Sequence, residues 1–208
     1  MLVRHFMTRP VITLDPKTTC ADAAREMRKR RIRRAPIATR KKVLGLITLH
    51  DLVRVLPGTI AEVDSEQAQK NCLRPVSELM SRTLHTVQMN DHLEQAAQLM
   101  LDHKIGGLPV LNKTELVGIL TESDVFRAMW GILSSGHGKR IILEEPDSND
   151  DTLDYLKLAL RHGCRPYSLL RCQRPGENTM TFLRVQGTDE DGLVEELWDS
   201  EAKVISID

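Results

Sequence analysis

Apolar positions recur along the first part of the chain in two forms, as short runs of strand length and as stretches at helical spacing. The runs "APIAT" and "VLGLIT" flank the polar turn "RKK", which predicts an antiparallel pair of strands. Before them an apolar stripe predicts a helix, with Thr19 and Asp22 in the positions that cap one. The stripe consists of Ala23, Ala24 and Met27. With "PVITLDP" as a first strand and "HDLVRVL" as the start of a last helix, the predicted order is strand, helix, strand, strand, helix.

The same pattern returns 73 residues later. Residues 5–56 superimpose on 78–129 without insertion or deletion. Matched pairs include Met7 with Met80, Thr13 with Thr86, Pro36 with Pro109, Gly45 with Gly118, Thr48 with Thr121, and Asp51 with Asp124. An internal period of this kind indicates a tandem duplication. Because a unit of about sixty residues buries little surface alone, we expect the two copies to pack together.

In the second copy, Asp91 and Glu94 are expected to cap the first helix, and Gly106-Gly107 to end it. Leu93, Ala97 and Met100 are expected to face the core.

Residues 139–208 show a different order. "KRIILEE" is a predicted strand, "NDDTLDYLKLALRHG" a helix, and "PYSLLRC" and "TMTFLRV" a hairpin around "QRPGEN". "TDEDGLVEELW", capped by Thr188, is a second helix and "AKVISID" a last strand. In the first of these helices the expected inward stripe is Leu153, Leu156 and Leu160. The predicted order is βαββαβ.

Charge changes where the pattern changes. The chain is neutral overall, but residues 1–138 carry 20 Lys and Arg against 14 Asp and Glu, and residues 139–208 carry 9 against 15. The small-residue stretch "SSGHGKR" lies at this change. We expect a first motif at 1–60, a linker at 61–73, a second motif at 74–133, a hinge at 134–138 and a C-terminal domain at 139–208.

Composition narrows the class of protein. Hydrophobic residues make up 41% of the chain, enough for packed cores, and no run approaches the ~18 apolar residues of a membrane span. "MLVRHFMTRP" lacks the apolar centre of a signal peptide, so we expect a cytoplasmic protein. The four cysteines and seven histidines show no metal-ligand spacing, and no nucleophile elbow or HExxH motif occurs. We therefore expect no catalytic residues, no metal and no catalytic cofactor.

The repeated pattern, above all Gly-x-x-Thr-x-x-Asp in "GLITLHD" and "GILTESD", resembles the CBS domain, and two in tandem resemble a CBS pair, or Bateman module. The resemblance implies an α+β fold in which the two units meet as a pseudo-dimer with two related clefts. In that family the clefts commonly bind AMP, ADP, ATP or S-adenosylmethionine as regulatory ligands. It also implies that modules pair, so we expect a homodimer and a regulated partner protein that the sequence does not name.

The βαββαβ tail is similar to the ferredoxin-like ACT domain, which in many proteins binds amino acids or mediates subunit pairing. Its first loop, "EEPDSNDD", lacks the Gly usual at ACT ligand sites, so pairing is the expected role. A CBS pair followed by such a tail resembles the acetoin-utilisation B proteins, which implies an association with acetoin or related carbon metabolism.

The Thr-x-x-Asp motif lies where a strand ends and a helix begins, where unpaired N–H groups and the helix dipole favour anions. A Thr hydroxyl there can donate to a phosphate, and the Asp can accept from both ribose hydroxyls. By this reasoning and the resemblance, the expected ligand-binding residues are Thr13, Arg34, Ala35, Ile37, Thr48, His50, Asp51, Thr86, Gly107, Leu108, Val110, Thr121, Ser123 and Asp124.

Two alternatives remain open. Asp51 and Asp124 can equally be helix caps in empty clefts, which would leave a structural adaptor. Ten of the eighteen residues at 25–42 are basic, which is typical of nucleic-acid binding, although no stacking aromatics accompany them. A solvated helix face or a phosphate-attracting rim explains the same residues.

Overall fold

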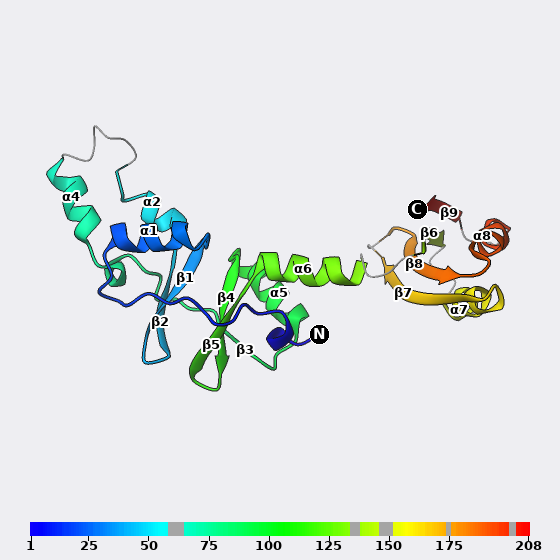
Figure 1. Ribbon diagram of the computed structural model, residues 1–208, viewed down its shortest axis with the longest axis horizontal. Helices are drawn as coiled ribbons and strands as arrows, with labels where there is room; N and C mark the ends of the chain where they lie inside the picture. The colour runs from blue at the N-terminus through cyan, green and yellow to red at the C-terminus, as the bar shows by residue number, and fades with distance from the viewer. Residues whose placement is uncertain (58–64, 134–137, 146–151, 174–175, 200–202) are drawn as a thin grey trace. The chain divides into compact units, whose positions relative to one another are not determined.

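The computed structural model describes residues 1–57, 65–133, 138–145, 152–173, 176–199 and 203–208. Their contacts divide into two compact units, Met1–Ala128 and Met129–Asp208 (Figure 1). Both copies of the duplication belong to the first unit, so the expectation that they pack together is confirmed. The expected hinge lies, apart from Gly138, outside the described residues, and so do residues 146–151 of the acidic loop "EEPDSNDD".

The first copy contains α1 (Cys20–Lys29), β1 (Arg34–Thr39), β2 (Lys42–Thr48) and α2 (Leu49–Val53). β1 and β2 pair antiparallel, as predicted. The Thr19 side chain accepts the N–H of Asp22 and caps α1, and the predicted apolar stripe of α1 is buried. The expected strand at "PVITLDP" is reduced to one bridge, between Leu14 and Ile37.

The second copy contains β3 (Val87–Gln88), α5 (Leu93–His103), β4 (Gly107–Asn112), β5 (Glu115–Thr121) and α6 (Glu122–Leu133). Its strands form one sheet in the order β3-β4-β5. The expected linker also contains a helix, α4 (Glu66–Leu73), which the pattern did not predict.

The predicted details of α5 were wrong in three places. Its N-cap is His92, while Asp91 accepts the N–H of Gln88 instead. Ala96, not Ala97, completes the buried stripe. The helix ends at Lys104, which adopts a left-handed φ of 52° before the glycines begin.

The leading segment of each copy packs on the other copy. The leading segment of the first copy begins with the 3₁₀ turn η1 (Val3–His5). Its residues Val3 and Met7 lie in the core of the second copy. The leading segment of the second copy follows α4 and begins with the 3₁₀ turn η2 (Val76–Glu78). Its residues Val76 and Met80 lie in the core of the first copy. Figure 1 accordingly shows the N-terminus beside α5. The two copies are therefore joined by an exchange of segments as well as by a shared surface.

Backbone hydrogen bonds fix this exchange at equivalent places. Thr8 and Ile119 bond to each other through N···O distances of 2.8 and 3.2 Å. Leu46 and Ser81 do the same at 3.0 and 2.9 Å. The exchanged segments thus extend the antiparallel hairpins of the opposite copies.

Glycine is required where the exchanged segments cross the hairpins. A Cβ on Gly118 would lie 2.7 Å from Sδ of Met7. A Cβ on Gly45 would meet Met80 and lie 2.9 Å from the carbonyl oxygen of Ser81. The Gly of the repeated Gly-x-x-Thr-x-x-Asp motif therefore serves segment packing.

The C-terminal unit contains β6 (Lys139–Glu145), α7 (Thr152–Arg161), β7 (Cys164–Cys172), β8 (Thr179–Gly187), α8 (Glu190–Trp198) and β9 (Lys203–Ile207). Its antiparallel sheet has the order β7-β8-β6-β9, so the predicted βαββαβ succession is confirmed. This is the ferredoxin-like arrangement. One apolar core lies between the sheet and its two helices.

Two details of this unit differ from the prediction. Leu153 and Leu160 of α7 are exposed, whereas Tyr155, Leu158 and Ala159 are buried. Both sets have helical spacing, so periodicity alone did not distinguish the inward face. The N-cap of α8 is Asp189, whose side chain accepts the N–H of Gly192, and not Thr188.

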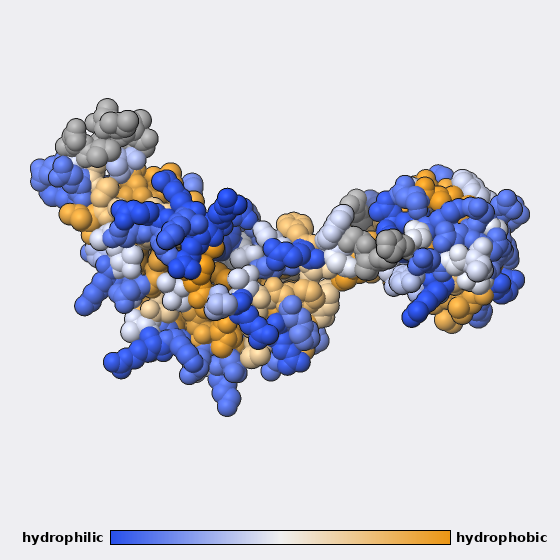
Figure 2. Space-filling view, viewed as in Figure 1, coloured by the Kyte–Doolittle hydropathy of each residue, from blue (hydrophilic) through white to orange (hydrophobic). Residues whose placement is uncertain are grey.

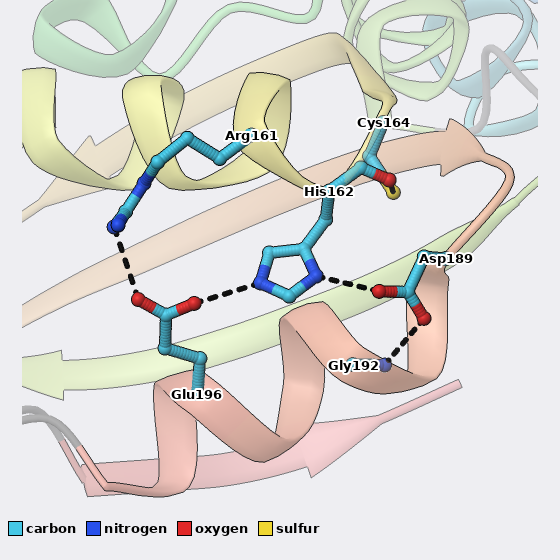
Figure 3. Close-up of polar contacts among 6 residues, drawn as sticks. All are labelled: Arg161, His162, Cys164, Asp189, Gly192 and Glu196. Carbon is cyan, nitrogen blue, oxygen red and sulfur yellow. Dashed lines mark hydrogen bonds and ion pairs between the residues drawn. The ribbon is translucent and has the colours of Figure 1, made fainter.

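A polar cluster ties α7 to α8 in this unit (Figure 3). Nδ1 of His162 lies 2.7 Å from Asp189 and its Nε2 lies 2.7 Å from Glu196. Arg161 also bonds Glu196, at 3.0 Å. Because each ring nitrogen faces a carboxylate, this arrangement favours the imidazolium cation, in which both nitrogens donate. These hydrogen bonds raise the pKa of His162 and lower the pKa of Asp189 and of Glu196.

We expect Gly45→Ala to lower the free energy of unfolding by about 2 kcal/mol, because the new methyl group overpacks the contact with Met80 and Ser81. Gly131→Ala is the control, since a Cβ at Gly131 would meet nothing within 4 Å, and helix propensity predicts a gain of up to about 1 kcal/mol. Urea unfolding followed by circular dichroism measures both. A Gly45→Ala variant as stable as the parent would contradict the close crossing.

The His162 cluster predicts a pH optimum for protection of α8. The pKa of His162 is raised above its ordinary 6.5, so its contribution is complete below 6.5 and is lost as pH rises through the folded value. The pKa values of Asp189 and Glu196 are lowered below their ordinary 3.8 and 4.5, so their contributions are lost as pH falls through the folded values. The protection factors of α8 amides in the full chain, which are exchange rates corrected for the intrinsic pH dependence of amide exchange, should be highest between about pH 5 and 6.5. His162→Gln should remove the decline on the alkaline side; an unchanged profile would rule out the imidazolium.

Candidate functional site

The repeated motif lies at the same junction in both copies. β2 ends at Thr48 where α2 begins, and β5 ends at Thr121 where α6 begins. The first N–H of each helix donates to a carbonyl at the start of the preceding hairpin. Leu49 donates to Arg33 at 2.8 Å, and Glu122 donates to Gly106 at 3.2 Å. Each motif is thereby held beside the start of its own hairpin.

The Thr and Asp of the motif bond to each other. Thr48 donates from both its N–H and its hydroxyl to Oδ2 of Asp51, at 2.9 and 2.7 Å, and Thr121 makes the same two bonds to Asp124. A Thr hydroxyl has a single hydrogen, which is used here. In this arrangement neither Thr can donate to a phosphate, so the role expected from sequence passes to other donors.

The two aspartates differ in the hydrogen-bond acceptor sites that remain available to a ligand. Asp124 is 2% exposed, and its Oδ1 also accepts from Arg127 at 2.9 Å and from Thr8 at 3.4 Å. Asp51 is half-buried, and its Oδ1 has no protein donor among the described residues. A carboxylate offers about four lone-pair sites. A ribose can therefore bond Asp51 directly, whereas at Asp124 it must displace Thr8 or Arg127.

A cavity adjoins each motif. The first cleft has a volume of about 430 Å³ and the second about 290 Å³. The first cleft is lined by Arg33, Arg34, Thr48, Leu49, His50 and Val53. The second cleft is lined by Thr8, Arg31, Ile32, Arg33, Arg34, Ile119, Thr121, Ser123, Asp124 and Arg127.

Arg34 crosses from the first copy to the second. A Cβ on Gly106 would lie 2.5 Å from both terminal nitrogens of Arg34, and one on Gly107 would lie 2.7 Å from its Cδ. Nη1 of Arg34 is buried and has no hydrogen-bond partner among the described residues. Burial lowers the pKa of the Arg34 guanidinium, and the nearby carboxylate of Glu122 acts in the opposite direction. The absence of a Cβ at Gly106 and Gly107 thus provides the space that the Arg34 side chain occupies.

The structure brings some of the expected site residues together and not others. Arg34, Thr48, His50, Thr121, Ser123 and Asp124 line the clefts. Asp51 caps α2 beside the first cleft. The side chains of Ala35, Ile37, Leu108 and Val110 are in the core, so their expected role rests on backbone groups. Thr13 is exposed, Thr86 is half-buried, and neither lines the two clefts.

Several lining residues were not expected. Thr8 reaches the second cleft because its segment is exchanged, which no local pattern indicates. Arg127 lies one helical turn after Asp124, and this spacing could have indicated the pair. Arg33 donates to Ser123 across the two copies at 3.2 Å.

The basic run at 25–42 does not act as one surface. Figure 2 shows hydrophilic side chains gathered over α1. There Arg25 and Arg30 form ion pairs with Asp22 and Glu26 of the same helix. Arg33 and Arg34 instead line the clefts, and Lys41 pairs with Glu115. The run therefore divides into a helix surface, a cleft wall and a hairpin turn.

Within the described residues no group of three or more His, Cys, Asp or Glu is placed to hold a metal ion. No helix in the same ranges is long and apolar enough to cross a membrane.

Two hairpin-and-helix units joined around paired clefts define a class of protein, and comparison of the sequence with protein families identifies it. The model of the CBS domain matches residues 3–58 and 76–131, more than half of the chain. The chain belongs to the CBS-domain family.

Solved structures of the same class resemble the CBS pair. A Vibrio cholerae protein described as an acetoin utilization protein (AcuB) is 33% identical, with a TM-score of 0.55, over 64% of this chain and 93% of that one. The CBS domain pair of protein MJ0100, in complex with 5-methylthioadenosine and S-adenosylmethionine, is 26% identical with a TM-score of 0.53, over 63% and 97%. CBSX2 in complex with AMP is 27% identical with a TM-score of 0.54, over 63% and 97%.

Among curated sequences, the chain is 29% identical over 163 residues to the uncharacterized protein MJ1225 of Methanocaldococcus jannaschii. The match covers 74% of this chain and 54% of that protein, so the chain spans about half of this relative's length.

Proposed function

We propose that this chain is a regulatory sensor that binds an adenosyl ligand in the clefts of its CBS pair and catalyses no reaction itself. The observation that supports this most directly is the pair of Thr-x-x-Asp caps, each beside a cavity with arginines in its wall. Related CBS pairs bind AMP, S-adenosylmethionine or methylthioadenosine. In the proposed complex Asp51 and Asp124 accept the ribose hydroxyls and the backbone near Ala35 and Leu108 contacts the base.

The finer parts of the proposal concern the tail and the surroundings of the protein. We propose that the ferredoxin-like unit is an ACT-like pairing element, and that the protein works in the cytoplasm on a partner yet to be identified. A link to acetoin metabolism is supported by the likeness to the Vibrio cholerae protein alone. The rival function, nucleic-acid binding through residues 25–42, is disfavoured because that run divides among three surfaces, each with basic side chains engaged in ion pairs or in a cleft wall.

The binding test uses three asparagine variants. Asp51→Asn and Asp124→Asn should each weaken adenosine-nucleotide binding at one cleft by about 1–3 kcal/mol, because a charged acceptor is lost. Asp22→Asn is the matched control, since Asp22 also accepts the hydroxyl of a Thr three residues earlier at the start of a helix and lines neither cleft. Calorimetric titration with AMP, ATP and S-adenosylmethionine at low and high salt measures the effect.

Each outcome of that titration bears on one function. Saturable binding that the two cleft variants weaken and the control does not supports the sensor. Absence of binding to every adenosyl compound would leave a structural adaptor. Binding of single-stranded or duplex nucleic acid with a steep salt dependence, unaffected by the cleft variants, would favour the rival function.

We also propose that the protein is a homodimer. Phe126, Met129, Trp130 and Leu133 recur on one face of α6 and are 70, 49, 69 and 42% exposed. Four large apolar side chains on one helical face are typical of a surface that pairs with another copy. Phe126→Ser should convert a dimer at micromolar concentration into a monomer in sedimentation velocity, whereas Leu101→Ser, at an isolated exposed leucine of α5, should not. A monomeric parent protein would refute the proposal.

A further inference from the structure

The second cleft carries an excess of positive charge. Its lining includes four guanidinium groups, from Arg31, Arg33, Arg34 and Arg127, and a single carboxylate, from Asp124. These groups come from the segment before β1, the start of β1 and the second turn of α6. Three of the four arginines belong to the basic run at 25–42, and the fold adds Arg127 of α6 to them at the same cleft.

Three of these four cations form no ion pair within the described residues, although the carboxylate of Glu122 lies near Arg34. Arg127 pairs with Asp124 at 2.9 Å. Arg33 donates to the neutral hydroxyl of Ser123, and no ion pair is formed by Arg31 or Arg34 within the described residues. Asp124 already accepts four donors, so it cannot neutralise the others. The cleft therefore lacks negative charge that a ligand can supply.

Arg34 is the donor that most needs such a ligand. Its Nη1 is buried without a hydrogen-bond partner, which is costly for a charged group. Gly106 and Gly107 have no Cβ, which leaves the space that the Arg34 side chain occupies in the wall of the cleft. The hydroxyls of Thr48 and Thr121 cannot donate to a ligand in place of Arg34, because each already donates to the aspartate of its own motif.

We infer that the second cleft takes an adenosine with a 5′-phosphate chain in preference to S-adenosylmethionine, and that Arg34 is the specificity-determining residue. This inference rests on the proposed function, since it names the ligand class of the same site. S-adenosylmethionine has a sulfonium cation attached to C5′, where a nucleotide has an anionic phosphate. Beside three unpaired guanidinium groups the cation is repelled and the phosphate attracted. When the ribose hydroxyls displace Arg127 from Asp124, that guanidinium becomes a further phosphate donor.

The test measures ligand preference in an Asp51→Asn background, which removes the ribose acceptor of the first cleft. In this background ADP and ATP should bind roughly tenfold or more tightly than adenosine, methylthioadenosine or S-adenosylmethionine, as one charge-assisted hydrogen bond requires. Arg34→Met should erase most of that difference and leave adenosine binding within about twofold, which also reports that the cleft is intact. Arg34→Lys should restore part of this difference in affinity, because lysine carries the positive charge but not the planar, bidentate donors of a guanidinium group.

Arg28→Met is the matched control. Arg28 belongs to the same basic run, is exposed on α1 and lines neither cleft, so it removes an equal charge at a distance. The Arg28→Met variant should bind each of these adenosyl ligands with the same affinity as the protein without this substitution. Inorganic pyrophosphate is a further ligand, and it should bind at least roughly tenfold more weakly than ADP because it lacks the nucleoside.

The outcomes separate this inference from the proposed function. S-adenosylmethionine binding as tightly as ATP, or nucleotide binding unaffected by Arg34→Met, would overturn the inference and leave the sensor function standing. Pyrophosphate binding as tightly as ADP would overturn the assignment of an adenosine ligand to this cleft. If adenosine, methylthioadenosine, S-adenosylmethionine and both nucleotides all fail to bind, the proposed function fails with it.

Discussion

The close passage of Met7 over Gly118 and of Met80 over Gly45 is the constraint on which the N-terminal unit depends. Each passage carries the leading segment of one copy into the core of the other. It also carries Thr8 to the second cleft, within 3.4 Å of Asp124. Glycine at the two crossings therefore governs both the joining of the copies and the composition of a ligand site. The Thr-x-x-Asp caps that follow depend on hairpins held in place by these crossings.

The duplication has kept a symmetric frame and changed the side chains within it. Arg33-Arg34 in the first copy corresponds to Gly106-Gly107 in the second. The glycine pair leaves the space that Arg34 occupies, so the two substitutions are complementary. The two aspartates, equivalent in sequence, differ for a separate reason, because Oδ1 of Asp124 accepts from Thr8 and Arg127 whereas Oδ1 of Asp51 has no protein donor among the described residues. Two clefts of the same origin thus differ both in the arginine that lines them and in the contacts of their aspartates.

Much of this could be predicted from the sequence, because its signals are local. Thr19 with Asp22 and Thr48 with Asp51 specify caps within four residues, and the hairpins follow from apolar runs around a turn. The exchange of segments could not be predicted. Met7 and Met80 are equivalent in the repeat, so packing within a copy and packing between copies satisfy the same pattern.

The failures elsewhere have a similar cause. Helical spacing fits Leu153, Leu156 and Leu160 as well as Tyr155, Leu158 and Ala159, and only the position of the sheet decides between them. The unpaired state of Arg34 was equally hidden, because it depends on glycines some seventy residues away and on Thr hydroxyls that are already engaged. Local sequence patterns predicted the helices and strands. They did not predict which residues contact the side chains of these elements, because those contacts depend on the tertiary structure.

The exchange has a consequence for how the chain acquires its fold during synthesis. Val3 and Met7 leave the ribosome before the rest of their core, which is completed by Leu108, Val110 and Leu120, more than a hundred residues later. Pairing over such a separation is slow, because a long loop must close before the contacts form. The first copy likewise waits for Val76 and Met80. The first copy can complete its core only once the leading segment of the second has been made, and the second only with the leading segment of the first, so each repeat depends on residues of the other to fold.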